Sequence, residues 1–273
     1  MSDRAHRLWT WIFGDTLRDI DERAVAYVAS PQGRTLDRRV VLVLMTAAVC
    51  LIFRHYLGDR QWAHTLLEGA RAVGLAEGTG RPRASLIDQY TYWACVRVVG
   101  YFVLPALVIR HLLGGSLADY GGRLRGSFTS VGVYGSLLAI ALVMVALASG
   151  TEPFLAKYPF YRPAPGEPLW PHFYRWEVVY ALQFIATEFF YRGFLVHGLK
   201  HRFGTYAVLI AMVPYCMIHF GKPLPETAGA VIAGIALGLM SLKTGSVWMG
   251  ALLHILVAWA MDFASLRSQG LFF

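Results

Sequence analysis

The segment Ala186-Thr187-Glu188-Phe189-Phe190-Tyr191-Arg192-Gly193-Phe194-Leu195 places an acid and a base inside an otherwise apolar run. A charged side chain at the centre of a bilayer costs roughly 3 kcal/mol, so a Glu within a membrane-spanning helix predicts a functional site. Glu188 and Arg192 stand at i and i+4, which puts them about 40° apart on one face of an α-helix, where each can neutralise the other. The structural alternative is a buried ion pair that only fixes helix register.

The composition indicates that lipid surrounds this segment. Of the 273 residues, 56% are hydrophobic and only 15% are charged, which is too apolar for a soluble domain of this size. We therefore expect an all-α fold, a polytopic bundle of about seven transmembrane helices. The apolar runs lie at residues 40–57, 90–109, 127–149, 176–199, 206–220, 226–242 and 247–263. The net charge of +8 comes largely from Arg residues in the N-terminal segment and the loops, and no basic stripe with interleaved aromatic residues indicates a nucleic-acid partner.

These runs predict four parts of the chain. Residues 1–39 form a basic amphipathic N-terminal segment, and residues 40–175 contain the first transmembrane helices and a Pro-rich loop. Residues 176–263 form the core helices, and residues 264–273 form a C-terminal tail. The Pro-rich loop suits either a lid over a site or a simple tether.

Arg97 lies inside the second apolar run, where a buried Arg needs an acidic or carbonyl partner. Glu188 is one acceptor that the sequence offers for it. Two histidines also lie in apolar runs: His219 ends the fifth run, and His254 lies within the seventh. A buried His is often just a hydrogen-bonded core residue. However, three helices that each supply a titratable group can bring them together in a bundle, where one Glu and two His could activate water or hold a metal such as zinc.

These residues carry a resemblance to a known family. Glu188 with Arg192 and Gly193, then Tyr215-Cys216-Met217-Ile218-His219, then His254 in the last helix resemble the CPBP family of CAAX prenyl proteases and bacteriocin-processing intramembrane proteases. The resemblance covers about residues 176–263. It implies an integral membrane protein of the bacterial inner membrane that cleaves near the C-terminus of a membrane-associated protein, or removes a leader peptide.

The resemblance also implies roles for particular residues. The family pattern has Glu-Glu-x-x-x-Arg, then an aromatic residue four before a His, then His-x-x-x-Asn. Glu188, Arg192, His219 and His254 match it, and the same acid and two histidines would be the metal ligands if a metal is used. Thr187 replaces the first Glu of the pattern, and Ala258 replaces the Asn.

Those two departures leave several mechanisms open. The leading hypothesis has Glu188 as base or metal ligand, His219 as its partner in activating water, His254 polarising the scissile carbonyl and Arg192 orienting Glu188. A second has Cys216 as a thiol nucleophile. A third is a catalytically degenerate member that serves as a membrane binding or immunity protein, and a proton or small-solute carrier is a further alternative.

Overall fold

The computed structural model describes residues 14–72, 85–164 and 166–271, and within them the fold is all-helical apart from one isolated bridge between Gly122 and Ser246. The first helices are α2 (Thr16–Ala29), η1 (Gln32–Arg34), α3 (Arg38–Leu57) and α4 (Trp62–Ala72). Next come α5 (Leu86–Val98), η2 (Val99–Val103), α6 (Leu104–His111), η3 (Leu117–Tyr120), η4 (Ser127–Ser130), α7 (Val131–Ala148) and α8 (Glu152–Lys157). The last are α9 (His172–Glu188), η5 (Phe189–Leu195), α10 (Val196–Phe203), α11 (Tyr206–Met217), α12 (Leu224–Thr244) and α13 (Trp248–Ser268).

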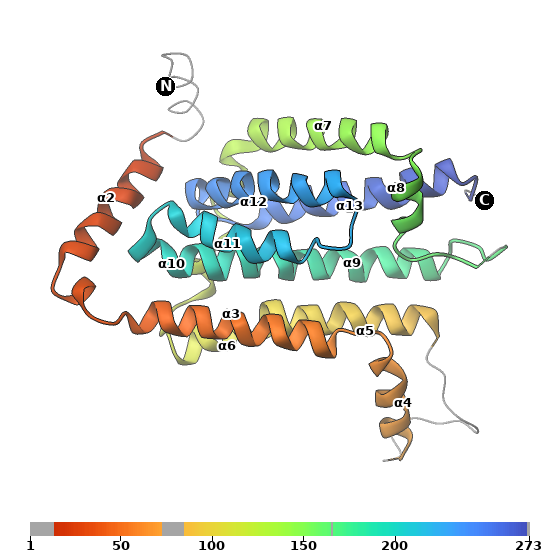
Figure 1. The fold of residues 1–273 in the computed structure, drawn as a ribbon, viewed down its shortest axis with the longest axis horizontal. Helices are drawn as coiled ribbons and strands as arrows, with labels where there is room; N and C mark the ends of the chain where they lie inside the picture. Colours follow the sequence, from red (N-terminus) through yellow and green to blue (C-terminus); the bar gives the residue numbers. More distant parts are fainter. Residues whose placement is uncertain (1–13, 73–84, 165, 272–273) are drawn as a thin grey trace.

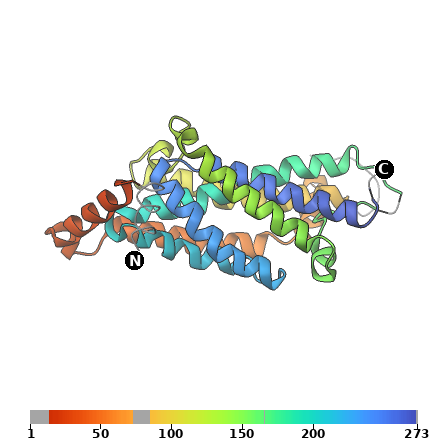
Figure 2. The same ribbon diagram turned by 90° about the horizontal axis from the view of Figure 1, so that it is seen from above.

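Most of the long helices follow the long axis of the molecule (Figure 1). Helices α3, α5 and α6 lie along one side, α9 to α11 in the middle, and α12, α13 and α7 beyond them. Figure 2 shows the same elongated bundle from above, with α2 projecting at one end. The continuous stretch α9–η5–α10 contacts α2, α3, α5, α11, α12 and α13, so it is the central element of the fold.

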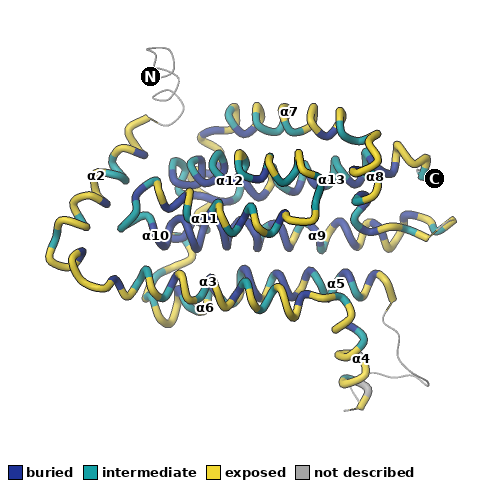
Figure 3. Tube along the Cα trace, in the orientation of Figure 1, coloured by how far each residue is buried: buried dark blue, intermediate teal, exposed yellow. Residues whose placement is uncertain are grey.

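Burial confirms this central position. Every residue of η5 is buried, whereas α3 and α7 expose large apolar side chains along most of their length (Figure 3). In water such apolar faces would be costly, and in a bilayer they face acyl chains of similar polarity. The structure therefore has a packed centre and a lipid-facing exterior.

Five helical segments of the described chain are long and apolar enough to cross a membrane: 38–57, 86–111, 127–148, 224–244 and 248–268. The expected polytopic helix bundle is thus confirmed, but two of the seven expected runs differ from full-length spans. The run at 206–220 forms α11, which is shorter, and the run at 176–199 forms the stretch α9–η5–α10, which is not among these five segments. The last helix continues to Ser268, beyond the expected end of the core at residue 263.

Local sequence signals explain where several helices begin and end. Asp37 caps α3 by accepting hydrogen bonds from the backbone N–H groups of Arg39 and Val40, and Ser85 caps α5 by accepting from the backbone N–H of Asp88. Gly245 ends α12 in the left-handed conformation that glycine adopts without strain. Of the expected amphipathic N-terminal segment, residues 16–29 form α2, and the apolar residues Leu8 to Ile12 lie outside the described residues.

Candidate functional site

Glu188 is the last residue of α9, and its side chain is fully buried. The Oε1 atom lies 2.8 Å from Nδ1 of His254 in α13, and 3.2 Å from Nη1 of Arg192 in η5. The ion pair expected from the i and i+4 spacing therefore forms, and an imidazole from a distant helix joins it. Because a carboxylate can only accept, Nδ1 of His254 carries the proton, and Nε2 of the neutral ring keeps a lone pair.

Tyr215 of α11 is in contact with three of the other site residues. Its ring is stacked under the Arg192 guanidinium, 3.8 Å from ring centroid to guanidinium carbon. The centroid of the same ring lies 4.7 Å from that of His219 and 6.3 Å from that of His254. An aromatic side chain thus links groups from three helices and holds Arg192 in place.

His219 lies in the turn that follows α11, and it is buried. Its Nδ1 donates to the backbone carbonyl of Tyr215 at 2.8 Å, which again leaves Nε2 with a lone pair in the neutral ring. His219 and His254 therefore contact the same Tyr215 ring and have the same tautomer. Of the two histidines, His254 is the one in direct hydrogen-bond contact with Glu188.

Two further residues shape the Glu188 environment. The ring centroid of Phe184 lies 4.2 Å from that of His254, and a Cβ atom on Gly250 would lie 3.3 Å from Oε2 of Glu188. That second carboxylate oxygen is buried and has no hydrogen-bond partner in the described part of the chain. Sequence reasoning missed both residues, although each stands four positions before a site residue on the same helical face: Phe184 before Glu188, and Gly250 before His254.

The two positions that depart from the family pattern have other surroundings. Thr187 donates its hydroxyl to the carbonyl of Gln183 in its own helix, at 2.8 Å. Ala258 is buried in an apolar cluster with Trp176 and Tyr180. Cys216, the alternative nucleophile, has its Sγ 3.9 Å from the carbonyl oxygen of Thr227.

Arg97 does not pair with Glu188, so that expectation is wrong. Its Nη1 donates instead to the carbonyl of Trp93, one turn earlier in α5, and Glu188 is already held by Arg192 and His254. The physical reason lies in the face of α9 that each residue uses: Tyr180 contacts Trp93 of α5, whereas Glu188 points toward α13.

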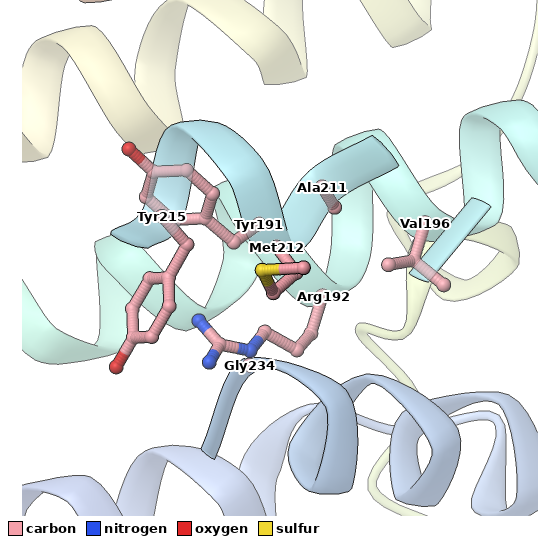
Figure 4. A pocket seen from close by; sticks show the side chains of 7 residues that line it. All are labelled: Tyr191, Arg192, Val196, Ala211, Met212, Tyr215 and Gly234. Atoms are coloured by element: carbon pink, nitrogen blue, oxygen red, sulfur yellow. The ribbon is translucent and has the colours of Figure 1, made fainter. Parts of the chain in front are cut away.

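Tyr215 and Arg192 also line a narrow gap between η5, α11 and α12 that is too small to hold a water molecule. Figure 4 shows the Arg192 guanidinium reaching toward Tyr215 and the gap, which Met212 and Gly234 also line. The Nε and both Nη atoms of Arg192 are buried without a hydrogen bond of good geometry. The histidines do not line this gap, and the His254 side chain is 16% exposed.

A metal at this site needs three or more ligands held close together. Among the residues that the structure describes, no three His, Cys, Asp or Glu side chains are so placed. The zinc ligand set of Glu188, His219 and His254 stays a prediction.

The geometry defines a helical membrane protein with a buried carboxylate–imidazole pair. Residues 168–260 match the family model described as type II CAAX prenyl endopeptidase Rce1-like, so this part of the chain is similar to the Rce1-like domain. It contains Glu188, Arg192, His219 and His254, and it overlaps nearly all of the expected core. Comparisons of the chain with curated proteins and with solved structures found no match.

Proposed function

We propose that the protein is an intramembrane endopeptidase that hydrolyses a peptide bond near the C-terminus, or in the leader, of a membrane-associated protein. The observation that carries this proposal is the 2.8 Å contact between Nδ1 of His254 and Oε1 of Glu188. A buried carboxylate that fixes the tautomer and orientation of a His is a recurrent way of making a general base. The Rce1-like domain supports the same reaction class.

In the proposed reaction, Nε2 of His254 takes a proton from water as the water oxygen attacks the scissile carbonyl carbon. Glu188 holds the ring and stabilises the imidazolium that forms. The C–N bond then breaks, and His254 returns the proton to the leaving amine. Arg192 keeps the carboxylate ionised and in place, so Glu188 acts through His254 here rather than as the direct base that the family pattern implies.

His219 is proposed to act on the carbonyl oxygen of the same scissile bond. Its Nδ1–H is held by a backbone carbonyl, so Nε2 is the atom that faces any reacting group. When protonated, this nitrogen would donate to the oxygen that becomes negative in the tetrahedral intermediate. Both histidines would thus act on the substrate through their Nε2 atoms.

The test replaces Glu188, His219 and His254 singly with Ala in the native host, with His111→Ala as the matched control. His111 is an exposed histidine at the end of α6, away from the site. The C-terminal and N-terminal peptides of the membrane proteins are then sequenced in each strain by mass spectrometry. We expect one or more precursor termini to persist in the three site variants and not in the control, and unchanged termini in all three would reject the endopeptidase.

A catalytically degenerate binding or immunity protein is the second candidate. Two observations favour it: the Thr187 hydroxyl is used within its own helix, and Ala258 offers no polar group. The double substitution T187E with A258N discriminates between them. Cleavage that appears only in this variant supports the degenerate protein, whereas cleavage by the native chain supports the enzyme.

A further inference from the structure

Two arginines outside the candidate site have no acidic partner among the described residues. Arg54 lies near the end of α3 and Arg97 lies in α5, and both helices belong to candidate membrane spans. Arg97 is only 6% exposed, and the one hydrogen bond of its guanidinium within the described residues runs from Nη1 to the carbonyl of Trp93, at 3.0 Å. The Nε atom of Arg54 is buried without any hydrogen-bond partner in the same part of the chain.

The two arginines lie close together where α3 meets α5. A Cβ atom on Gly58, one helical turn after Arg54, would lie 3.5 Å from Nη1 of Arg97. Gly58 in turn donates its backbone N–H to the carbonyl of Arg54, at 3.1 Å. No Asp or Glu of the described chain forms an ion pair with either arginine. Two adjacent cations of this kind repel each other, and an anion between them removes the repulsion.

The surroundings indicate which anion is available. The outer face of α3 exposes Met45, Val49 and Ile52, as a lipid-facing helix does. After Arg54, the exposed residues include Tyr56 and Trp62, whose aromatic rings carry polar groups. The Tyr92 hydroxyl donates to the carbonyl of Leu57 at the end of α3. Such aromatic residues mark the level of the lipid headgroups.

We propose that Arg54 and Arg97 together bind the phosphate group of an anionic phospholipid. A guanidinium presents parallel N–H groups that match two phosphate oxygens, and one face of Arg97 is already fixed on the Trp93 ring at 3.3 Å. The acyl chains would lie along the exposed apolar face of α3. The phosphate would join the two arginines of α3 and α5, and this role does not depend on the proposed protease activity.

The site lies beside the last turns of α9. Trp93 contacts Trp176 and Tyr180 of α9, and two turns later Tyr101 of η2 contacts Phe190 and Tyr191 of η5. Arg97, in α5, stands midway between Trp93 and Tyr101 along the chain, so it lies level with the α9 residues just before Glu188. A lipid bound here therefore supports the helix pair that flanks the candidate site.

The experiment measures thermal unfolding of the full-length protein in nanodiscs of pure phosphatidylcholine and of phosphatidylcholine with one quarter phosphatidylglycerol. We expect phosphatidylglycerol to raise the midpoint by about 5 °C in the wild type and to have little effect in R54Q/R97Q. R110Q is the matched control, because Arg110 is an exposed arginine at the other end of the same helical segment, and it should keep the shift. Native mass spectrometry counts the lipid that stays bound to each variant.

A separate sample in neutral detergent receives inorganic phosphate alone. If phosphate raises the unfolding midpoint in this sample and the rise requires both arginines, the site binds a soluble anion. If phosphatidylglycerol alone raises the midpoint, the site binds the lipid. If the double variant does not fold, the single variant R54Q decides, since Arg54 is only partly buried. An equal shift in wild type and variant, or no shift in the wild type, overturns the proposal.

Discussion

Glu188 makes no contact with solvent, so its chemistry at the residue scale depends on its two partners. A buried carboxylate is stable only when opposite charge and hydrogen bonds replace its lost hydration. Arg192 supplies the charge, and His254 supplies the hydrogen bond. We therefore expect Arg192 to affect mainly the stability of the fold and His254 to affect mainly the reactivity of the site.

We predict that E188Q and H254A each lower the rate of substrate cleavage by about 10²- to 10⁴-fold. Because Glu188 is proposed to act through His254, the double variant should lose little more than either single variant. Cleavage is measured on a precursor identified from the terminal peptides, in proteoliposomes. Losses that multiply in the double variant would mean that the two residues act independently.

Arg192→Leu tests the charge partner. We expect a loss of about 3–5 kcal/mol in the free energy of unfolding, because the substitution leaves a buried carboxylate without its counter-ion. Adding E188Q to the same chain should restore part of that loss, since the uncompensated charge is then gone. Denaturant titration in detergent micelles measures both values, and equal stability of the wild type and the Leu variant would contradict the prediction.

At the element scale, the close approach of η5 to η3 depends on Gly193. A Cβ atom there would lie 2.6 Å from the backbone oxygen of Tyr120 and 3.2 Å from Cδ2 of Phe189. Since a backbone oxygen moves less readily than the end of a side chain, the helices must shift to accept a methyl group. Gly193 is thus required for η5 to pack closely against η3, which the sequence motif alone does not indicate.

Gly193→Ala should lower the free energy of unfolding by about 1–3 kcal/mol through overpacking. The matched control is Gly132→Ala in α7, where nothing lies within 4 Å of the new Cβ atom. This control should be neutral or slightly stabilising, as expected for Ala in a helix. Thermal unfolding in the same detergent compares the two, and equal effects would contradict the packing argument.

The sequence predicted some elements well and others poorly, for a physical reason. Spacing within one helix is readable, so the contact between Glu188 and Arg192 and the long apolar spans could be predicted. The partner of a residue across a helix interface depends on which helix faces pack together. For this reason Arg97 was assigned the wrong partner, and the contacts of Tyr215 with both histidines were not expected. The π-helical turns of η2 and η5 also have no signal in a pattern analysis that assumes 3.6 residues per turn.

At the scale of the whole molecule, Asp37 ties the N-terminal part of the chain to the central helices. Its carboxylate accepts from Tyr27 at 2.9 Å and contacts Nε2 of His201 in α10 at 2.8 Å, besides capping α3. Burial raises the pKa of Asp37, but the hydrogen bonds from His201, the Val40 N–H and Tyr27 outweigh it and lower the pKa below its ordinary value. The carboxylate thus joins α2, α3 and α10.

A carboxyl group whose pKa is lower in the folded state stabilises the fold above its unfolded pKa, and this contribution is lost as the pH falls through the folded value. We therefore expect Asp37→Asn to be less stable than the wild type at pH 7, by about 1–3 kcal/mol, with the difference shrinking below about pH 4. Asn keeps the helix cap through its amide oxygen, so the substitution removes the charge and the acceptor of Tyr27 and His201 but not the cap. Apparent unfolding midpoints at several pH values test it, and a difference that does not change with pH would contradict the assignment.

The wide turns of η5 have a consequence for how insertions and deletions act on this chain. Every residue that such a turn adds to an α-helix rotates the downstream helix by about 100° about its axis. Removing one residue between positions 189 and 195 would give a more regular helix, yet it would turn α10 and carry His201 away from Asp37. The bundle is therefore expected to tolerate changes of length in its loops and not in the central stretch α9–η5–α10.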